Sequence, residues 1–176
     1  MRVGNPITVE PKAGGKYRMC VDARWTNAHT PKPYFKLETP AQALPETVRK
    51  GDRMITTDIA KAYYAVPIAD EIGPYLAVEF DGKWYIPRVL PFGHSLAYVF
   101  NKIVRQTVAV SRVLGVRVYN YFDDYLWMME KGEETATVGW ARFLLQRLGW
   151  STNMKCVWEP STEADFMGLL IPRHSL

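Results

Sequence analysis

The 176-residue sequence predicts an α+β fold, in which an antiparallel sheet is layered with helices on one side. Apolar segments of strand length alternate with amphipathic segments of helix length along the whole chain. Some of the strand-like segments are close enough in sequence to form hairpins, which make neighbouring strands antiparallel. The content of 48% hydrophobic residues is sufficient for a packed core.

The first predicted strands lie on either side of a proline-rich connector. "KYRMCVDAR" (16–24) and "RMITTDIA" (53–60) are short apolar runs typical of strands. The connector between them, residues 30–46, is expected to be extended and to end in a short helix. It marks a boundary between an N-terminal lobe, residues 1–50, and a second lobe, residues 51–176.

A hairpin and a helix are predicted for the middle of the chain. After "KAYYAVPI", in which Pro67 ends any helical turn, residues 75–90 form two apolar runs around Asp81-Gly82, a dipeptide typical of tight hairpin turns. Residues 95–115 repeat apolar residues at helical spacing and end in a glycine. The expected buried face of this helix consists of Phe100, Ile103, Val104, Thr107 and Val108.

The C-terminal part of the chain predicts a second hairpin, a second long helix and two short strands. The two apolar runs on either side of Asp123-Asp124 form the hairpin. Residues 133–149 are expected to be a helix, because an acidic start suits the helix dipole and a glycine suits the C-terminal cap. Its expected buried face consists of Ala141, Leu144, Leu145 and Leu148. The short strands are predicted near residues 152–158 and 165–171.

Two adjacent aspartates, Asp123 and Asp124, lie inside an apolar run, where unpaired carboxylates are costly to bury. Asp58 lies at the end of another predicted strand. If the two elements are neighbours in one sheet, the carboxylates converge, and divalent cations such as Mg²⁺, which prefer oxygen ligands, can neutralise them. The alternative, a solvated Asp-Asp turn, is the more common fate of this dipeptide taken alone.

The charge pattern and the cysteines limit the kinds of function. Residues 1–53 carry a net charge of +5, residues 54–128 carry 0 and residues 129–176 carry −1. The basic third suits a phosphate-binding surface, with an ordinary solvated face as the alternative. Cys20 and Cys156 are far apart in sequence and suit free thiols inside the cell, in cytoplasm or nucleus, with a disulfide as the alternative. The three histidines are too scattered for a zinc site.

Six segments resemble the motifs of reverse transcriptases. They are, in chain order, "KYRMCVDARWTN", "DIAKAYYAVPI", "LPFG" before an apolar helix, "YFDD", "LGWSTNMKCVWEP" and "DFMGLLI". The sequences around "LPFG", "VFNKIV" and "YFDDYLWM" are most similar to those of retroelements of the long-terminal-repeat or DIRS type. The resemblance implies the fingers and palm of a right-hand polymerase. The fingers would be residues 1–50 with the hairpin near 75–90, and the palm the rest of residues 51–176.

The resemblance implies an RNA-directed DNA polymerase that adds deoxynucleotides to a primer 3′ end by two-metal nucleotidyl transfer. Asp58, Asp123 and Asp124 match the catalytic, metal-binding aspartates of the family, so two Mg²⁺ ions, replaceable by Mn²⁺, are the expected cofactors. Lys155 matches a lysine proposed as general acid to the pyrophosphate, with a surface lysine as the alternative. The expected partners are an RNA or DNA template with its primer and deoxynucleoside triphosphates, not a membrane.

Further residues match positions around the incoming nucleotide. Arg18, with Lys12 or Lys16, would neutralise the triphosphate, unless Lys16 and Arg18 form a solvated strand edge. Tyr63 matches the aromatic steric gate that excludes a ribose 2′-hydroxyl, with core packing beside its neighbour Tyr64 as the alternative. The other expected contacts are the main-chain groups of Ile59 and Ala60 near the metal and triphosphate, and Phe92 and Gly93 beneath the nucleotide and template.

The resemblance also implies primer contacts. Tyr121 and Phe122 are expected at the primer end, and Phe166 and Gly168 in the primer grip, where a core phenylalanine and a strand glycine are the alternative. The segment "LPFGHSLAYVF" departs from the family pattern, because His94 replaces a leucine and Tyr98 a proline. No segment resembles a thumb, a connection or an RNase H domain, so weak, distributive synthesis is expected without them.

Two other functions remain compatible with the sequence. A degenerate or domesticated relative would bind nucleic acid or a protein partner through the same surface without catalysis. The three aspartates favour the enzyme, whereas the altered "HSLAY" favours this alternative. A different palm-type metal enzyme, such as a nucleotide cyclase, is disfavoured because it needs neither the fingers strand nor a primer grip.

Overall fold

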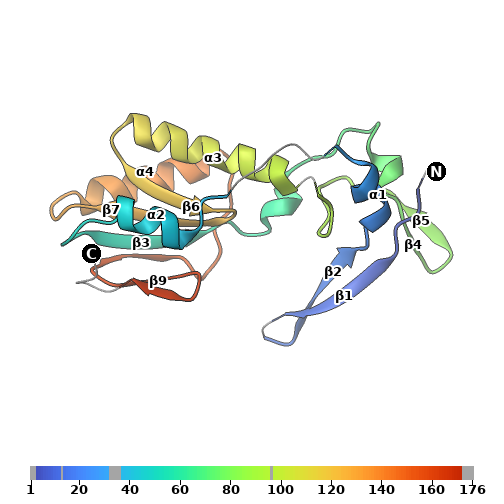
Figure 1. Ribbon diagram of the computed structural model, residues 1–176, viewed down its shortest axis with the longest axis horizontal. Helices are drawn as coiled ribbons and strands as arrows, with labels where there is room; N and C mark the ends of the chain where they lie inside the picture. The colour runs from blue at the N-terminus through green and yellow to red at the C-terminus, as the bar shows by residue number, and fades with distance from the viewer. Residues whose placement is uncertain (1–2, 13, 32–36, 96, 172–176) are drawn as a thin grey trace. The chain divides into compact units, whose positions relative to one another are not determined.

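A computed structural model describes residues 3–12, 14–31, 37–95 and 97–171 of the chain (Figure 1). The predicted α+β class is confirmed, with helices and antiparallel strands throughout. The chain divides into two compact units: unit 1 is Met1–Phe35 with Ala62–Phe100, and unit 2 is Lys36–Lys61 with Asn101–Leu176. Unit 1 includes the hairpin near 75–90 that was expected to belong with the N-terminal lobe. The lobe boundary at residues 50 and 51 stays a prediction.

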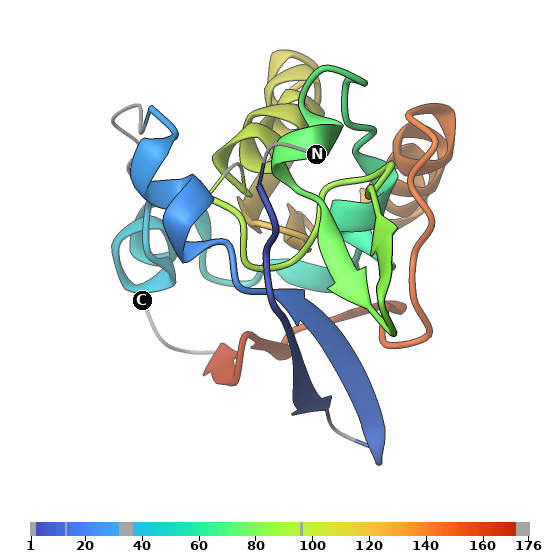
Figure 2. The same ribbon diagram turned by 90° about the vertical axis from the view of Figure 1, so that its right-hand side faces the viewer.

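Unit 1 contains two hairpins, which Figure 2 shows in blue and green. In one, β1 (Ile7–Lys12) pairs antiparallel with β2 (Lys16–Val21), and in the other, β4 (Val78–Phe80) pairs antiparallel with β5 (Lys83–Tyr85). The predicted Asp81-Gly82 turn is confirmed, since both residues have positive φ. Strand β1 was not predicted, and five of its six side chains are exposed.

Short helices complete unit 1. Helix α1 (Arg24–His29) begins where the predicted first strand was expected to end, and it was not predicted because it spans less than two turns. Two 3₁₀ turns, η1 (Ala62–Ala65) and η2 (Gly73–Tyr75), lead up to β4, and η1 ends before Pro67 as expected. One hydrophobic cluster of the unit consists of the buried Val21, Ala23 and Val78 with the partly buried Ile7.

Unit 2 is built on a four-stranded antiparallel sheet, counted over the described residues, with strand order β6-β7-β3-β8. The strands are β6 (Arg117–Tyr121), β7 (Asp124–Met129), β3 (Arg53–Asp58) and β8 (Val157–Ser161). A further hairpin consists of β9 (Ala164–Phe166) and β10 (Leu169–Ile171), where one short strand was expected. The hairpin turn at Met167-Gly168 splits that predicted strand in two, since both residues have positive φ.

The two faces of this sheet are covered by different elements. Helices α3 (Ala97–Val113) and α4 (Glu134–Arg147) run along the sheet (Figure 1), and the Tyr125 hydroxyl donates to the Val104 carbonyl of α3 at 3.2 Å. The opposite face packs against α2 (Pro40–Thr47) and the β9–β10 hairpin. The buried core on that face consists of Ala43, Leu44, Met54, Tyr119, Leu126, Met128, Ala164, Phe166 and Ile171.

The predicted buried faces of the two long helices are largely confirmed. In α3, Phe100, Val104 and Val108 are buried, but Ile103 is 40% exposed. In α4, Ala141, Leu144 and Leu145 are buried, but Leu148, just beyond its end, is 47% exposed. The buried stripe of α3 instead includes two polar residues, Asn101 and Ser111, because the 3.6-residue period places them on the inner side.

A buried ion pair fixes the segment after α2 to the sheet. The Arg117 guanidinium of β6 donates to both carboxylate oxygens of Asp52, at 2.5 and 2.6 Å, and to the Thr47 carbonyl at 3.2 Å. The Asp52 side chain is only 3% exposed. The Asp52 carboxylate raises the pKa of Arg117 by hydrogen bonding, so the guanidinium stays charged.

Replacement of Asp52 by alanine should therefore destabilise the protein. Asp52→Ala leaves the guanidinium without its partner, and we expect the free energy of unfolding to fall by about 3 kcal/mol in urea denaturation. Glu130→Ala is the control, because its pair with Arg49 is more than half exposed on both sides and should contribute little. Equal effects of the two substitutions would contradict the structural role of Asp52.

Candidate active site

The three candidate aspartates come together at one end of the unit 2 sheet. Asp58 is the last residue of β3, and the strand register places Asp124, the first residue of β7, directly opposite it. Asp123 lies in the β6–β7 turn, where its main-chain carbonyl accepts a hydrogen bond from the Ile59 N–H at 3.0 Å. The expected pairing of the two strands is therefore confirmed. The strand partner of Asp58 is Asp124, and Asp123 lies in the adjoining turn.

The turn that carries Asp123 depends on an unusual backbone at Phe122. Phe122 has a φ of 51°, in the left-handed region, which a bulky side chain rarely adopts. The rings of Tyr121 and Phe122 meet edge to face with centroids 5.3 Å apart. Both residues are half-buried at the edge of the aspartate cluster. Contact of these two rings with a primer end stays a prediction.

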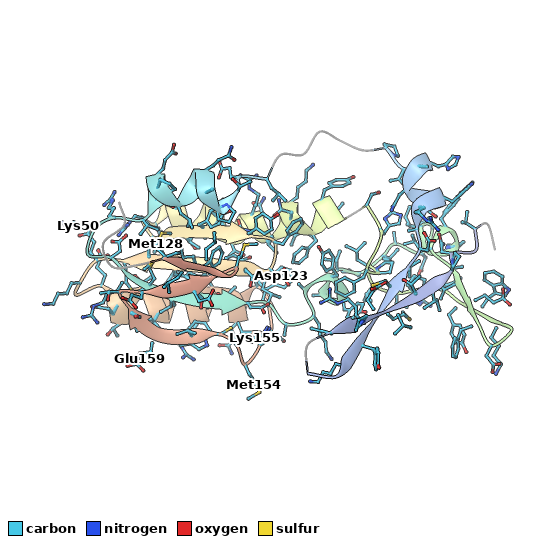
Figure 3. All side chains as sticks on the ribbon, turned by 60° about the horizontal axis from the view of Figure 1, so that its bottom comes forward. Lys50, Asp123, Met128, Met154, Lys155 and Glu159 are labelled. Carbon is cyan, nitrogen blue, oxygen red and sulfur yellow. The ribbon has the colours of Figure 1, made fainter. Side chains whose placement is uncertain are left out.

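The carboxylates share one electrostatic environment. Burial and, to a smaller extent, the negative charges of Asp123 and Asp58 together raise the pKa of Asp124 to about 6, while the Lys155 ammonium opposes this increase. Figure 3 shows Asp123 and Lys155 at the same end of the sheet. The exposed Lys155 thus offsets part of the effect that the two neighbouring carboxylates have on Asp124.

Two residues of the site were missed by sequence reasoning. Asn153 donates its side-chain amide to Asp58 Oδ2, and its main-chain N–H donates to the Asp58 carbonyl at 3.1 Å. The Cys156 thiol accepts the Asp58 main-chain N–H at 3.2 Å. The sequence carries no pattern that links these positions to Asp58 across more than 90 residues. Cys20 and Cys156 are free thiols, as expected.

The loop that follows α4 and contains Ser151, Thr152 and Asn153 also contacts the main chain after Asp58. The Ala60 N–H donates to the Ser151 carbonyl at 2.7 Å, and Ile59, which is 2% exposed, forms an isolated bridge with Thr152. The N–H groups of Ile59 and Ala60 are thus both bound within the protein. These residues lie beside the aspartates, and a role near a triphosphate stays a prediction.

A second set of candidate residues meets within unit 1. The Arg18 guanidinium lies 4.5 Å from the centre of the Phe92 ring, and Tyr63 meets the same ring edge to face at 4.8 Å. Gly93 lies so close to the Val21 carbonyl that an added Cβ would come within 2.1 Å of it, and its φ is +101°, so only glycine fits. The structure brings together Arg18, Tyr63, Phe92 and Gly93 as the sequence motifs suggested.

The choice between Lys12 and Lys16 stays open. The two lysines are directly opposite each other at the end of the β1–β2 hairpin, and both are exposed. Either ammonium can therefore reach the same ligand from this hairpin end.

The two primer-grip candidates differ in burial. Phe166 is 2% exposed and packs edge to face on Tyr119, with ring centroids 5.8 Å apart, so it is a core residue. Gly168 has a φ of +76° and forms the exposed β9–β10 turn. Primer contact of this hairpin stays a prediction, and it would involve the turn rather than the Phe166 ring.

His94, which replaces a leucine of the family pattern, has a buried side chain. His94 is 5% exposed, and burial lowers its pKa, which favours the neutral imidazole. The Asn27 side chain holds the segment on both sides of His94, donating to the Gly93 carbonyl at 2.9 Å and accepting the Ser95 N–H at 2.7 Å. His174 lies outside the described residues.

The aspartates fit a divalent cation in chemistry and charge. Carboxylate oxygens are the ligands that Mg²⁺ and Mn²⁺ take, and the pKa of Asp124 is raised by burial and by neighbouring negative charges that such a cation would neutralise. Within residues 3–12, 14–31, 37–95 and 97–171, no group of three or more His, Cys, Asp or Glu side chains is placed so that it could hold a metal ion. Two carboxylates with ligands from a bound substrate would complete a metal site.

Comparison with known proteins gives a consistent result. A model of the family described as "Reverse transcriptase (RNA-dependent DNA polymerase)" matches residues 10–169. The Pol polyproteins of equine infectious anemia virus, strain Wyoming and isolate 1369, are 29% identical to the chain over 132 residues. This alignment covers 68% of the chain and 11% of each polyprotein, so the chain spans about a tenth of these relatives.

Solved structures show the same fold. A foamy viral protease-reverse transcriptase in complex with double-stranded DNA superposes with a TM-score of 0.87 at 23% identity, over 97% of the chain and 30% of that protein. A foamy viral protease-reverse transcriptase in complex with an RNA/DNA hybrid gives a TM-score of 0.78 at 21% identity, again over 97% of the chain and 23% of that protein.

No helix in the described part of the chain combines the length and apolar character needed to cross a membrane.

The raised pKa of Asp124 predicts a pH-dependent stability. Between pH 3.8 and about 6 the folded protein binds this proton more tightly than the unfolded chain, so the free energy of unfolding falls as pH rises through this window. Asp124→Asn removes the buried charge, and in chelator we expect it to be more stable than wild type at pH 7 by about 2 kcal/mol. Near pH 3.5 the difference should be much smaller.

Urea denaturation at the two pH values measures this difference. Glu159→Gln is the control, because Glu159 is an exposed carboxylate on β8 of the same unit. A stability difference for Asp124→Asn that is independent of pH would contradict the electrostatic explanation.

Proposed function

Because the chain belongs to the reverse transcriptase (RNA-dependent DNA polymerase) family and has its fingers–palm fold, we propose that it adds deoxynucleotides to a primer 3′ end on an RNA template. The single observation that carries this proposal is the register of β3 and β7, which sets Asp58 opposite Asp124 beside Asp123. A non-catalytic relative would have no need for a carboxylate cluster in which burial raises the pKa of Asp124.

The proposed metal ligands are Asp58 and Asp123, with Asp124 completing the acidic cluster. When bound, two Mg²⁺ or Mn²⁺ ions would supply activation of the attacking hydroxyl and neutralisation of the leaving pyrophosphate. The protein holds the carboxylates in place through the β3–β7 register and the Ile59 hydrogen bond to the Asp123 carbonyl. Lys155, whose charge acts on the same cluster, is proposed to donate a proton from Nζ to the pyrophosphate.

The proposed nucleotide-binding groups lie on unit 1. Arg18 and one or both of Lys12 and Lys16 are exposed cations on the β1–β2 hairpin and would bind the triphosphate oxygens. Tyr63 is half-buried and packs on Phe92, an aromatic position suited to excluding a 2′-hydroxyl.

The proposed partners are a template with its primer. The foamy viral relatives were solved with double-stranded DNA and with an RNA/DNA hybrid, and the basic first third of this chain suits such a polyanion. An intracellular location is proposed from the two free thiols, which a reducing compartment preserves.

Primer extension tests the catalytic assignment. On a poly(rA)/oligo(dT) template with Mg²⁺ or Mn²⁺, wild type should incorporate deoxythymidine, and Asp123→Asn should lose more than about 100-fold of this rate, since even an outer partner of a metal ligand contributes 10–100-fold. Asp70→Asn is the control, because that carboxylate is 85% exposed and belongs to unit 1. Equal rates for wild type and Asp123→Asn would contradict the catalytic role of Asp123.

Sugar selection gives an independent test of Tyr63. Removal of the ring by Tyr63→Ala should raise the incorporation of ribonucleotides relative to deoxynucleotides about tenfold or more, because steric exclusion of one hydroxyl is lost. Tyr64→Ala is a matched control, since Tyr64 also packs edge to face on Phe92, at 5.3 Å. If both variants, or neither, changed the ratio of the two rates, Tyr63 would have no specific gating role.

A further inference from the structure

We propose that Asn153 is a positioning residue, which orients the Asp58 carboxylate so that one oxygen faces a divalent cation. The inference rests on the proposed metal role of Asp58. Asn153 lies in the loop between α4 and β8, and it is not one of the proposed metal ligands or nucleotide-binding residues. Its side-chain amide donates to Asp58 Oδ2.

Both polar atoms of the Asn153 side-chain amide, Nδ2 and Oδ1, have partners that determine its orientation. Its Oδ1 accepts the Lys155 main-chain N–H at 2.7 Å, in a local turn typical of asparagine. If the amide were flipped, its NH₂ group would face that N–H and its oxygen would face the Asp58 carboxylate. Both contacts would then be repulsive, so the NH₂ group must face Asp58.

Main-chain contacts hold Asn153 in register with Asp58. The Asn153 N–H donates to the Asp58 carbonyl at 3.1 Å, and the Cys156 thiol accepts the Asp58 N–H at 3.2 Å. Between them, Met154 is fully exposed, and Figure 3 shows its side chain pointing away from the sheet. The loop is therefore fastened to the end of β3 on both sides of Met154, and Asn153 reaches the carboxylate from that fixed position.

The Asp58 carboxylate binds the neutral Asn153 amide, whereas the Asp52 carboxylate binds a charged guanidinium. Both oxygens of Asp52 bind the Arg117 guanidinium, which cancels the charge. An amide instead occupies Asp58 Oδ2 and fixes the plane of the group without cancelling its charge. A carboxylate that is both oriented and still negative is the state that a metal ligand requires.

Titration of Mn²⁺ into the protein alone, followed by electron paramagnetic resonance, tests the inference. Loss of the amide in Asn153→Ala should weaken Mn²⁺ binding about tenfold, within the range measured when a partner of a metal ligand is removed. Met154→Ala should bind Mn²⁺ as wild type does.

Cys156→Ala separates orientation of the carboxylate from stability of the loop. This variant loses the contact to the Asp58 main chain and keeps the Asn153 amide. Thermal unfolding of each variant shows how far the loop is loosened. Weaker Mn²⁺ binding in Asn153→Ala than in an equally destabilised Cys156→Ala supports the inference. Equal affinity in Asn153→Ala and wild type, equal weakening in both variants, or no Mn²⁺ binding by wild type would overturn it.

The outcome is distinguishable from a failure of the proposed function. Absence of primer extension by wild type would remove the polymerase activity, while a Mn²⁺ affinity that depends on Asn153 would still establish its positioning role. Conversely, an active wild type with unchanged Mn²⁺ affinity in Asn153→Ala would leave the polymerase in place and remove the role of Asn153.

Discussion

The burial of carboxylates at one end of an antiparallel sheet is the constraint on which unit 2 depends. The β3–β7 register sets Asp58 opposite Asp124, and the turn adds Asp123 at the same edge. Negative charges in this position repel one another and lose hydration, which raises the pKa of Asp124 to about 6. The apolar remainder of β7, from Tyr125 to Met129, is completely buried and anchors the hairpin against this cost.

The neighbourhood of the cluster stabilises it with neutral groups. Asn153 and Cys156 bind the side chain and main chain of Asp58, and the Ile59 N–H binds the carbonyl of Asp123. Lys155 is the nearby cation, and it is exposed. At the other end of the same sheet, where β3 and β6 begin, the partly buried Arg117 guanidinium binds the buried Asp52 carboxylate and cancels its charge. The site thus preserves negative charge where a cation is proposed to bind, and the framework cancels it elsewhere.

Most of the secondary structure was predictable because strong local signals specify it. The Asp81-Gly82 turn, the apolar periods of α3 and α4 and the runs around Asp123-Asp124 agree with the structure. Strand β1 and helix α1 were not predicted, since five of the six side chains of β1 are exposed and α1 is too short to show a helical period. The turn at Met167-Gly168 was not predicted either, because a methionine with left-handed backbone has no distinctive sequence signal.

The sequence by itself determined the class of the fold, the order of the motifs and the identity of the three aspartates, because these depend on local pattern and on residue chemistry. The tertiary structure decided that Asp124 is the strand partner of Asp58, that Phe166 belongs to the core and that Asn153 reaches Asp58. These three facts depend on strand register and on contacts between residues far apart in the chain. No local pattern encodes such contacts, because they form only when the packed sheet brings distant segments together.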